Sequence, residues 1–189
     1  VRAGRDIATT TSMRAVRKST ASLNAPAVVS SDAGNHRAHW PPRPVTGTLN
    51  LTQVRFADRD ISARGGDNVG AAVFLTGSAV LHASAVTFGN LSANHGGAVY
   101  IGQGSALATF VGCSFEDNEA TALWGGGGAV AVYSGAAAVF TGCRFLRNRA
   151  YIGAAVWSNG AVKAEVSTFA GNVASAQGGG LVAADGSAA

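Results

Sequence analysis

The sequence is poor in charged residues, sulfur and proline. Charged residues make up 13% of the 189 positions, and there are 2 cysteines, 4 prolines and 1 methionine. A typical globular protein has about 25% charged residues. No run of 18 apolar residues occurs, so the sequence predicts no membrane-spanning helix. No apolar pattern with a period of 3.6 residues occurs either, which argues against a helical protein.

Motifs for several kinds of chemistry are also missing. The glycine run over 125–128 is not followed by the Lys-Ser/Thr of a phosphate loop, and no Gly-Xaa-Ser-Xaa-Gly nucleophile elbow occurs. His82 and His95 have no partner at metal-ligand spacing, and His36 and His39 lie in the N-terminal tail. The calcium-binding nonapeptide is absent as well. We therefore expect no metal site and no cofactor.

Glycine is abundant, at 26 positions, and it belongs to a repeated motif. In each copy a Phe stands two or three residues before an Asn, and Gly-Gly-Ala-Val or a close variant follows. The copies begin at Phe56, Phe88, Phe115, Phe145 and Phe169, where Phe88-Gly89-Asn90 is a looser copy and Phe56 a degenerate one. Counted on Ala72, Ala98, Ala129, Ala155 and Leu181, the steps are 26, 31, 26 and 26 residues. Such a period marks a stack of equivalent supersecondary units.

Each repeat contains two short β-patterned runs. Leu49 and Leu51 alternate with polar residues, which is typical of a half-buried strand, and Gln53 marks a kink that Gly112 and Gly142 occupy in later repeats. Glycine costs roughly 1 kcal/mol per helical position, which again disfavours helices. We predict an all-β fold, a single-stranded right-handed parallel β-helix of about five rungs over 46–189. The 31-residue step predicts a longer corner loop over 123–126.

Stacked rungs place equivalent side chains above one another. We expect a structural ladder of Phe rings and a ladder of Asn side chains that bond their own backbone at a turn. The Phe ladder contains Phe88, Phe115, Phe145 and Phe169, and the Asn ladder contains Asn118, Asn148 and Asn172. Cys113 and Cys143 should also be stacked on the inner face, either as a pair of small buried residues or as a disulfide.

The positive charge is confined to the tail. Residues 1–45 hold 7 basic and 2 acidic residues, a net +5, whereas 46–189 hold 7 basic and 8 acidic residues, a net −1. The composition of the tail predicts a disordered or leader-like segment that ends in a Pro-rich linker. The nearly neutral charge of the repeat region predicts no nucleic-acid partner. We also expect the β-helix to continue beyond residue 189.

The combination of Phe-Xaa-Xaa-Asn with Gly-Gly-Ala-aliphatic resembles the repeats of chlamydial polymorphic outer membrane proteins. It is also similar to the wider set of right-handed β-helix, pectin-lyase-like repeat proteins. The resemblance covers 46–189 and is best for the copies at Phe115, Phe145 and Phe169. At the Phe56 copy, Arg59 stands in the Asn place. The resemblance implies a secreted or surface-exposed passenger domain, often an adhesin.

Carboxylates are the residues to weigh for catalysis. Pectate-lyase chemistry needs clustered carboxylates for calcium and an Arg that removes a proton from the sugar. The candidates are Asp58, Asp60 and Asp67 in the first rung and Glu116, Asp117 and Glu119 in the third. Alignment of the rungs places Asp117 beside Arg147 and Glu119 beside Arg149, so an ion-pair ladder is the favoured interpretation.

An aromatic face is the main candidate for binding. If Val73, Val99, Val130, Val156 and Val182 point inward, the outward residues are Phe74, Tyr100, Ala131, Trp157 and Ala183. Phe74, Tyr100 and Trp157 would then be exposed on one face and could contact a glycan or another surface protein. The alternative is that a loop covers these rings, or that they fill the habitual Tyr position of such repeats.

Two functions follow from these features. The first is a non-catalytic, secreted or cell-surface β-helix repeat module, adhesin- or scaffold-like, with a carbohydrate as the candidate ligand. The second is part of a pectin-lyase-like carbohydrate-active enzyme, either a polysaccharide lyase or a glycoside hydrolase. Three or more carboxylates on one face of neighbouring rungs, with an Arg nearby, would favour the enzyme. The sequence offers an ion-pair ladder instead, so we favour the first function.

Overall fold

The computed structural model describes Val45, residues 47–62 and residues 68–184. The expectations for the tail over 1–44, and for Asp67, lie outside the described residues. Within the described part of the chain all regular structure is β-strand, and every strand pairing is parallel. The predicted parallel β-helix is therefore confirmed.

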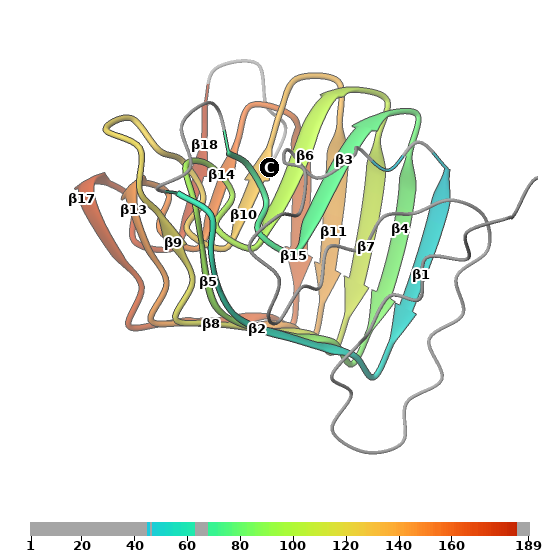
Figure 1. Ribbon diagram of the computed structural model, residues 1–189, viewed down its shortest axis with the longest axis horizontal. Helices are drawn as coiled ribbons and strands as arrows, with labels where there is room; N and C mark the ends of the chain where they lie inside the picture. Colours follow the sequence, from blue (N-terminus) through green and yellow to red (C-terminus); the bar gives the residue numbers. More distant parts are fainter. Residues whose placement is uncertain (1–44, 46, 63–67, 185–189) are drawn as a thin grey trace, which may run out of the picture.

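Three parallel sheets run along the coil, and Figure 1 shows their strands laid side by side. The first sheet contains, in spatial order, β1 (Thr48–Thr52), β4 (Val80–Ser84), β7 (Leu107–Val111), β11 (Ala137–Thr141) and β15 (Ala161–Glu165). The second contains β16 (Thr168–Ala170), β12 (Arg144–Leu146), β8 (Ser114–Glu116), β5 (Thr87–Ala93), β9 (Glu119–Ala120), β13 (Arg149–Ile152) and β17 (Val173–Gln177), with β2 (Arg55–Asp60) paired to β5. The third contains β18 (Leu181–Ala183), β14 (Val156–Ser158), β10 (Val130–Val132), β6 (Val99–Gly104) and β3 (Val73–Gly77).

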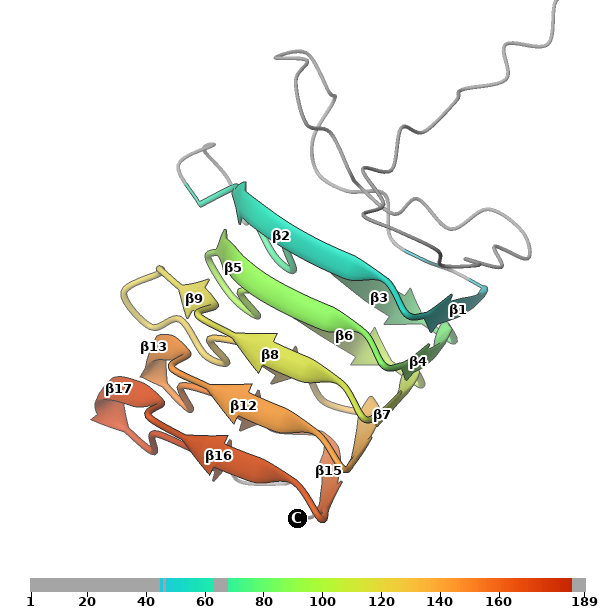
Figure 2. The ribbon, with the colours of Figure 1, turned by 90° about the horizontal axis from the view of Figure 1, so that it is seen from below.

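Each rung visits the first, second and third sheets in turn, and the path from β3 to β18 makes four complete turns. In Figure 2 the near strands β2, β5, β8, β12 and β16 run from right to left while the chain advances down the view. This is the sense of a right-handed coil, as the chirality of parallel crossovers predicts.

Two columns of Phe rings fill the core. Phe88, Phe115 and Phe145 stack with ring centroids 4.8 Å apart, and Phe56 and Phe169 extend the column at 5.4 and 4.7 Å. Phe110 and Phe140 come from the first sheet, stack on each other at 4.9 Å, and meet the first column edge to face. The third sheet closes the core with Val73, Val99, Val130 and Val156.

The last rung differs from its predicted register by one residue. Leu181, and not Val182, pairs with Val156, so the last step of the third sheet is 25 residues. Val182 therefore pairs with Trp157, and Ala183 with Ser158. A bulge that sets Ile152 opposite Gln177 already absorbs one extra residue, and alignment of Val182 with Val156 would have required a second.

The kink between the first and second sheets recurs in every rung. Its residues have a positive φ, between 50° and 62°, and are Gln53, Ala85, Gly112, Gly142 and Val166. The predicted kink at Gln53, Gly112 and Gly142 is present. Left-handed backbone is easy for glycine and strained for a β-branched residue, so Val166 is the most strained member of this column.

An asparagine ladder of Asn118, Asn148 and Asn172 follows the Phe column at the bend of the second sheet. Asn148 Nδ2 donates to the Phe115 carbonyl at 2.9 Å and to Asn172 Oδ1 at 2.9 Å. Its Oδ1 accepts hydrogen bonds from the backbone N–H and from Nδ2 of Asn118, both at 3.0 Å. The side chains therefore bond the backbone of the neighbouring rung, and not their own turn as the sequence suggested.

The looser copy at Phe88 does not extend this ladder. Phe88 lies on Phe115, which places Asn90 level with Asp117 and Leu91 level with Asn118. Leu91 supplies only its backbone N–H, which donates to Asn118 Oδ1 at 3.1 Å. In the first rung Arg59 is level with Leu91, and so in the column of Asn118.

Replacement of Val166 by Gly tests the strain at the kink. We expect Val166→Gly to raise the free energy of unfolding by about 1 kcal/mol, because it removes a β-branched residue from left-handed backbone. The side chain is 92% exposed, so little packing is lost. Chemical denaturation measures the change. Val173→Gly, at an exposed strand position, is the control and should lower stability; equal effects at both sites would contradict this explanation.

Removal of a ladder amide tests the contribution of the asparagine ladder. Asn148 is fully buried, so Asn148→Ala removes the Nδ2 donor to the Phe115 carbonyl and leaves the Asn118 N–H without its side-chain acceptor. We expect a loss of roughly 3 kcal/mol in the free energy of unfolding. Asn172→Ala, at a half-buried position, should cost about 1 kcal/mol. A loss at Asn148 no larger than that at Asn172 would show that these bonds matter little.

Candidate functional site

The predicted aromatic face lies on the outer side of the third sheet. Phe74, Tyr100 and Trp157 occupy one outward column, and Ala131 holds the same place in the third rung. The sequence does not reveal that Tyr133, two residues further on, fills the gap above Ala131. The Tyr133 ring lies 4.7 Å from Tyr100 and 4.9 Å from Trp157, measured between centroids. Phe74 adds a fourth ring, 5.3 Å from Tyr100.

We call these four residues, Phe74, Tyr100, Tyr133 and Trp157, the aromatic strip. All four are half-buried, because each ring packs against the next. The sequence had predicted that the rings of Phe74, Tyr100 and Trp157 are exposed. Ala131 is fully buried beneath the strip. Ala183 is not a member of the column, since the register of the last rung places Val182 beside Trp157.

The extra residues of the third rung form a loop over 121–129, which we call the wide loop. Backbone hydrogen bonds fix both of its sides: Thr121 N–H donates to the Ala93 carbonyl at 2.8 Å, and Tyr151 N–H donates to the Gly125 carbonyl at 3.1 Å. Gly126 lies directly under the Trp157 ring, where a Cβ would come within 2.7 Å of Trp157 Cγ. The wide loop therefore lies against the aromatic strip.

Two bulky apolar residues of the wide loop face solvent. Leu123 is 75% and Trp124 is 68% exposed, and the Trp124 ring meets Tyr151 edge to face at 4.9 Å. Trp124 is the more accessible aromatic surface, although its place in the sequence predicted only a corner loop. The signal was there, since Leu123-Trp124 interrupts a segment that elsewhere contains only small residues.

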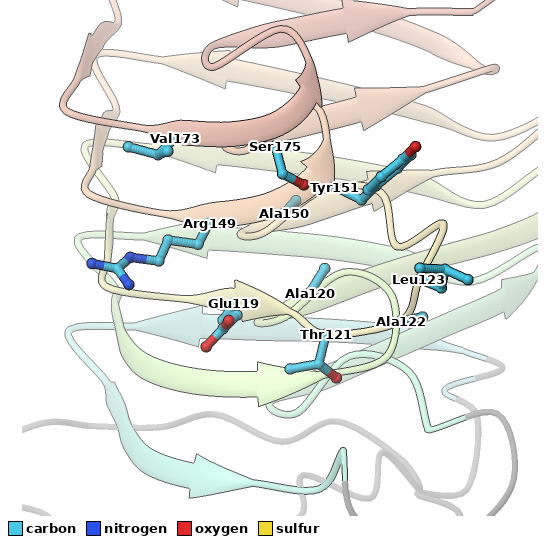
Figure 3. Close-up of a pocket in the computed structure, with 10 residues that line it drawn as sticks. All are labelled: Glu119, Ala120, Thr121, Ala122, Leu123, Arg149, Ala150, Tyr151, Val173 and Ser175. Carbon is cyan, nitrogen blue, oxygen red and sulfur yellow. The ribbon is translucent and has the colours of Figure 1, made fainter.

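Beside the wide loop the second sheet is hollowed over β9, β13 and β17. The hollow has a volume of about 590 Å³, and we call it the β13 groove. Its lining includes Glu119, Thr121, Leu123, Arg149, Tyr151 and Ser175. Figure 3 shows Tyr151 and Leu123 toward one end of the groove, and Glu119 and Arg149 toward the other.

Of the two predicted ion pairs, the one between Asp117 and Arg147 is formed. Arg147 Nε and Nη2 donate to the two carboxylate oxygens of Asp117, both at 2.8 Å. The hydrogen bond from Arg147 holds the pKa of the Asp117 carboxyl below its ordinary value. Glu119 and Arg149 are paired in register, but no ion pair joins their side chains within the described part of the chain.

A second, polar hollow of about 350 Å³ lies over the first three rungs. Asp58, Arg59, Asp60, Asn90, Ser92 and Glu119 line it, and we call it the acidic hollow. Asn90 Nδ2 donates to Asp58 Oδ1 at 2.9 Å, and the Ser62 hydroxyl donates to Asp60 Oδ1 at 2.7 Å. Asp58 and Asp60 were candidates from the sequence, but their proximity to the hollow that Glu119 lines, two rungs away, is visible only in the structure. Among the described residues, no group of three His, Cys, Asp or Glu side chains is placed to hold a metal ion.

The two cysteines are buried and carry free thiols. The Cys113 thiol donates to the Ala83 carbonyl at 3.5 Å, and the Cys143 thiol to the Phe110 carbonyl at 3.4 Å. A hydrogen bond with Cys143, together with burial, raises the pKa of the Cys113 thiol. Both side chains are buried in the core, where they pack as small apolar residues.

The fold and these surfaces define a parallel β-solenoid repeat protein with aromatic and mixed polar surfaces along its sides. Within the described residues there is no helix that could cross a membrane. No protein-family model matches this chain, and neither does any curated protein or solved structure.

Proposed function

We propose that this chain is a non-catalytic β-helix repeat module of the extracellular space or cell surface, adhesin- or scaffold-like, that binds carbohydrate. The observation that carries the proposal is the aromatic strip. Its four rings follow one another across four rungs at centroid distances of 4.7 to 5.3 Å. Phe, Tyr and Trp combine a large apolar surface with, in Tyr and Trp, a polar group, and such rings suit the apolar faces of sugars.

The location is part of the same proposal. It rests on the likeness of the repeats to those of polymorphic outer membrane proteins and of pectin-lyase-like β-helices. A rigid solenoid also suits display, because its surface repeats at the spacing of its rungs and presents one extended face to a partner. The aromatic strip also suits a protein partner. If the glycan screen finds no ligand, a protein is the remaining candidate partner for the strip.

The aromatic strip is tested by removing two of its three rings that carry a polar group, Tyr100 and Trp157, and screening for glycan binding. We expect the wild type to bind glycans on an array, and the double variant Tyr100→Ala, Trp157→Ala to lose at least tenfold in affinity with an unchanged circular dichroism spectrum. Leu107→Ala, at an exposed apolar position on the first sheet, is the control and should bind as the wild type does. Glycan binding that survives the double substitution would contradict a role for the strip.

A second function has one specific observation in its favour. The acidic hollow brings Asp58, Asp60 and Glu119 together with Arg59, which is the combination expected of a pectin-lyase-like polysaccharide lyase or glycoside hydrolase. We rank it second because Asp58 and Asp60 are already hydrogen-bonded to Asn90 and Ser62, and the carboxylates do not converge into a set that could hold calcium.

The two functions differ in one assay. Incubation with polygalacturonate and calcium should give no rise in the ultraviolet absorbance of unsaturated uronides. A rise that Asp60→Asn abolishes would establish the lyase and overturn the non-catalytic proposal. Asp117→Asn is the matched control, since that carboxylate is held by Arg147 outside the acidic hollow.

A further inference from the structure

The β13 groove is a built feature, because the residues that wall it are fixed from several sides. The wide loop is closed by a turn in which Gly125 N–H donates to the Ala122 carbonyl at 2.7 Å. The Gly125 carbonyl in turn accepts from the N–H groups of Tyr151 and Ile152, at 3.1 and 3.2 Å. Leu123 therefore stays beside Tyr151 without help from a ligand, and the groove is preformed.

The Tyr151 ring is the apolar platform of the groove. The edge-to-face contact with Trp124, at 4.9 Å, limits the orientations that the Tyr151 ring can adopt. Below it the floor is made of the small side chains of Ala120 and Ala150. A volume of about 590 Å³ lies within the range of about 300–1,000 Å³ that is typical of small-ligand sites.

The charged groups of the groove are Glu119 and Arg149. Within the described part of the chain, neither the Glu119 carboxylate nor the Arg149 guanidinium has a hydrogen-bond or ion-pair partner, although the two residues are neighbours in register. One side offers acceptors and the other offers donors, and their charges offset each other. Such a pair favours a neutral ligand with several hydroxyl groups over an ion of either sign.

A peptide that binds by addition of a strand does not fit this groove. β13 pairs with β9 on one side and with β17 on the other, so its backbone groups are already used. Strand addition requires an unpaired edge. The groove therefore recognises its ligand through side chains.

We propose that the β13 groove binds one residue of a neutral oligosaccharide, with the Tyr151 ring against the apolar face of the sugar and with Glu119 and Arg149 bonded to its hydroxyls. The inference rests on the proposed function, since it takes carbohydrate as the ligand class. It adds a second site on a different sheet and names the kind of sugar. Thr121 and Ser175, on opposite sides of the groove, also line it (Figure 3).

The test uses neutral oligosaccharides and uronate-containing oligosaccharides side by side, with the full chain. For the best neutral ligand, we expect Tyr151→Ala to weaken binding at least tenfold and Tyr151→Phe to change it less than twofold. Ser175→Trp, which fills the groove without removing a wall, should also abolish binding and serves if Tyr151→Ala folds poorly. The indole N–H signal of Trp124, assigned with Trp124→Phe, should shift in the NMR spectrum when the sugar is added.

The outcomes separate the two proposals. Neutral glycan binding that is lost in Tyr100→Ala, Trp157→Ala but intact in Tyr151→Ala and Ser175→Trp would overturn the groove site and leave the proposed function standing. Tighter binding of uronate oligosaccharides at this groove would overturn its assignment to neutral sugars. Absence of binding to any glycan would overturn the groove site and carbohydrate as the ligand of the proposed function.

Discussion

The structure depends on one constraint, the in-register parallel stacking of successive rungs. Backbone hydrogen bonds of three sheets fix which residue lies above which, so a residue repeated once per rung becomes a column. Phe rings then stack at 4.7 to 5.4 Å, and Asn amides bond from rung to rung. The asparagine ladder matters most where it satisfies buried backbone groups at the bend, since an unpaired polar group there would cost about 1–3 kcal/mol.

The same constraint decides where irregularity can go. Inner columns must stay level, so extra residues have to leave the coil as loops or bulges. In the third rung they form the wide loop, and in the last rung a single bulge opposite Ile152 takes up one residue. The wide loop creates both the exposed Trp124 and the wall of the β13 groove. The β13 groove thus arises at the least regular part of the solenoid, as expected for a rigid scaffold that carries function on loops.

The outer surface changes character along the coil. Asp58, Asp60 and Glu119 gather over the early rungs, whereas Arg147 and Arg149 follow in the fourth. Asp117 and Arg147 neutralise each other across one rung step, and Glu119 is shared by the acidic hollow and the β13 groove. The two hollows therefore meet at one residue. A long polymeric ligand lying along the axis would contact both, whereas the aromatic strip belongs to a separate sheet.

The sequence by itself determined the coil, the inner Phe column and the kinks at Gln53, Gly112 and Gly142, because inner residues are level by necessity and their repetition can be counted. It did not determine the register of the last rung, since a run of glycines before Leu181 leaves the alignment ambiguous by one residue. Only the tertiary structure decided that Tyr133 completes the aromatic strip, that Trp124 contacts Tyr151, and that Glu119 lines the same hollow as Asp60 and Arg59. Outward side chains have no partner imposed by register, so their contacts depend on loop lengths and on how each ring or charge turns in space.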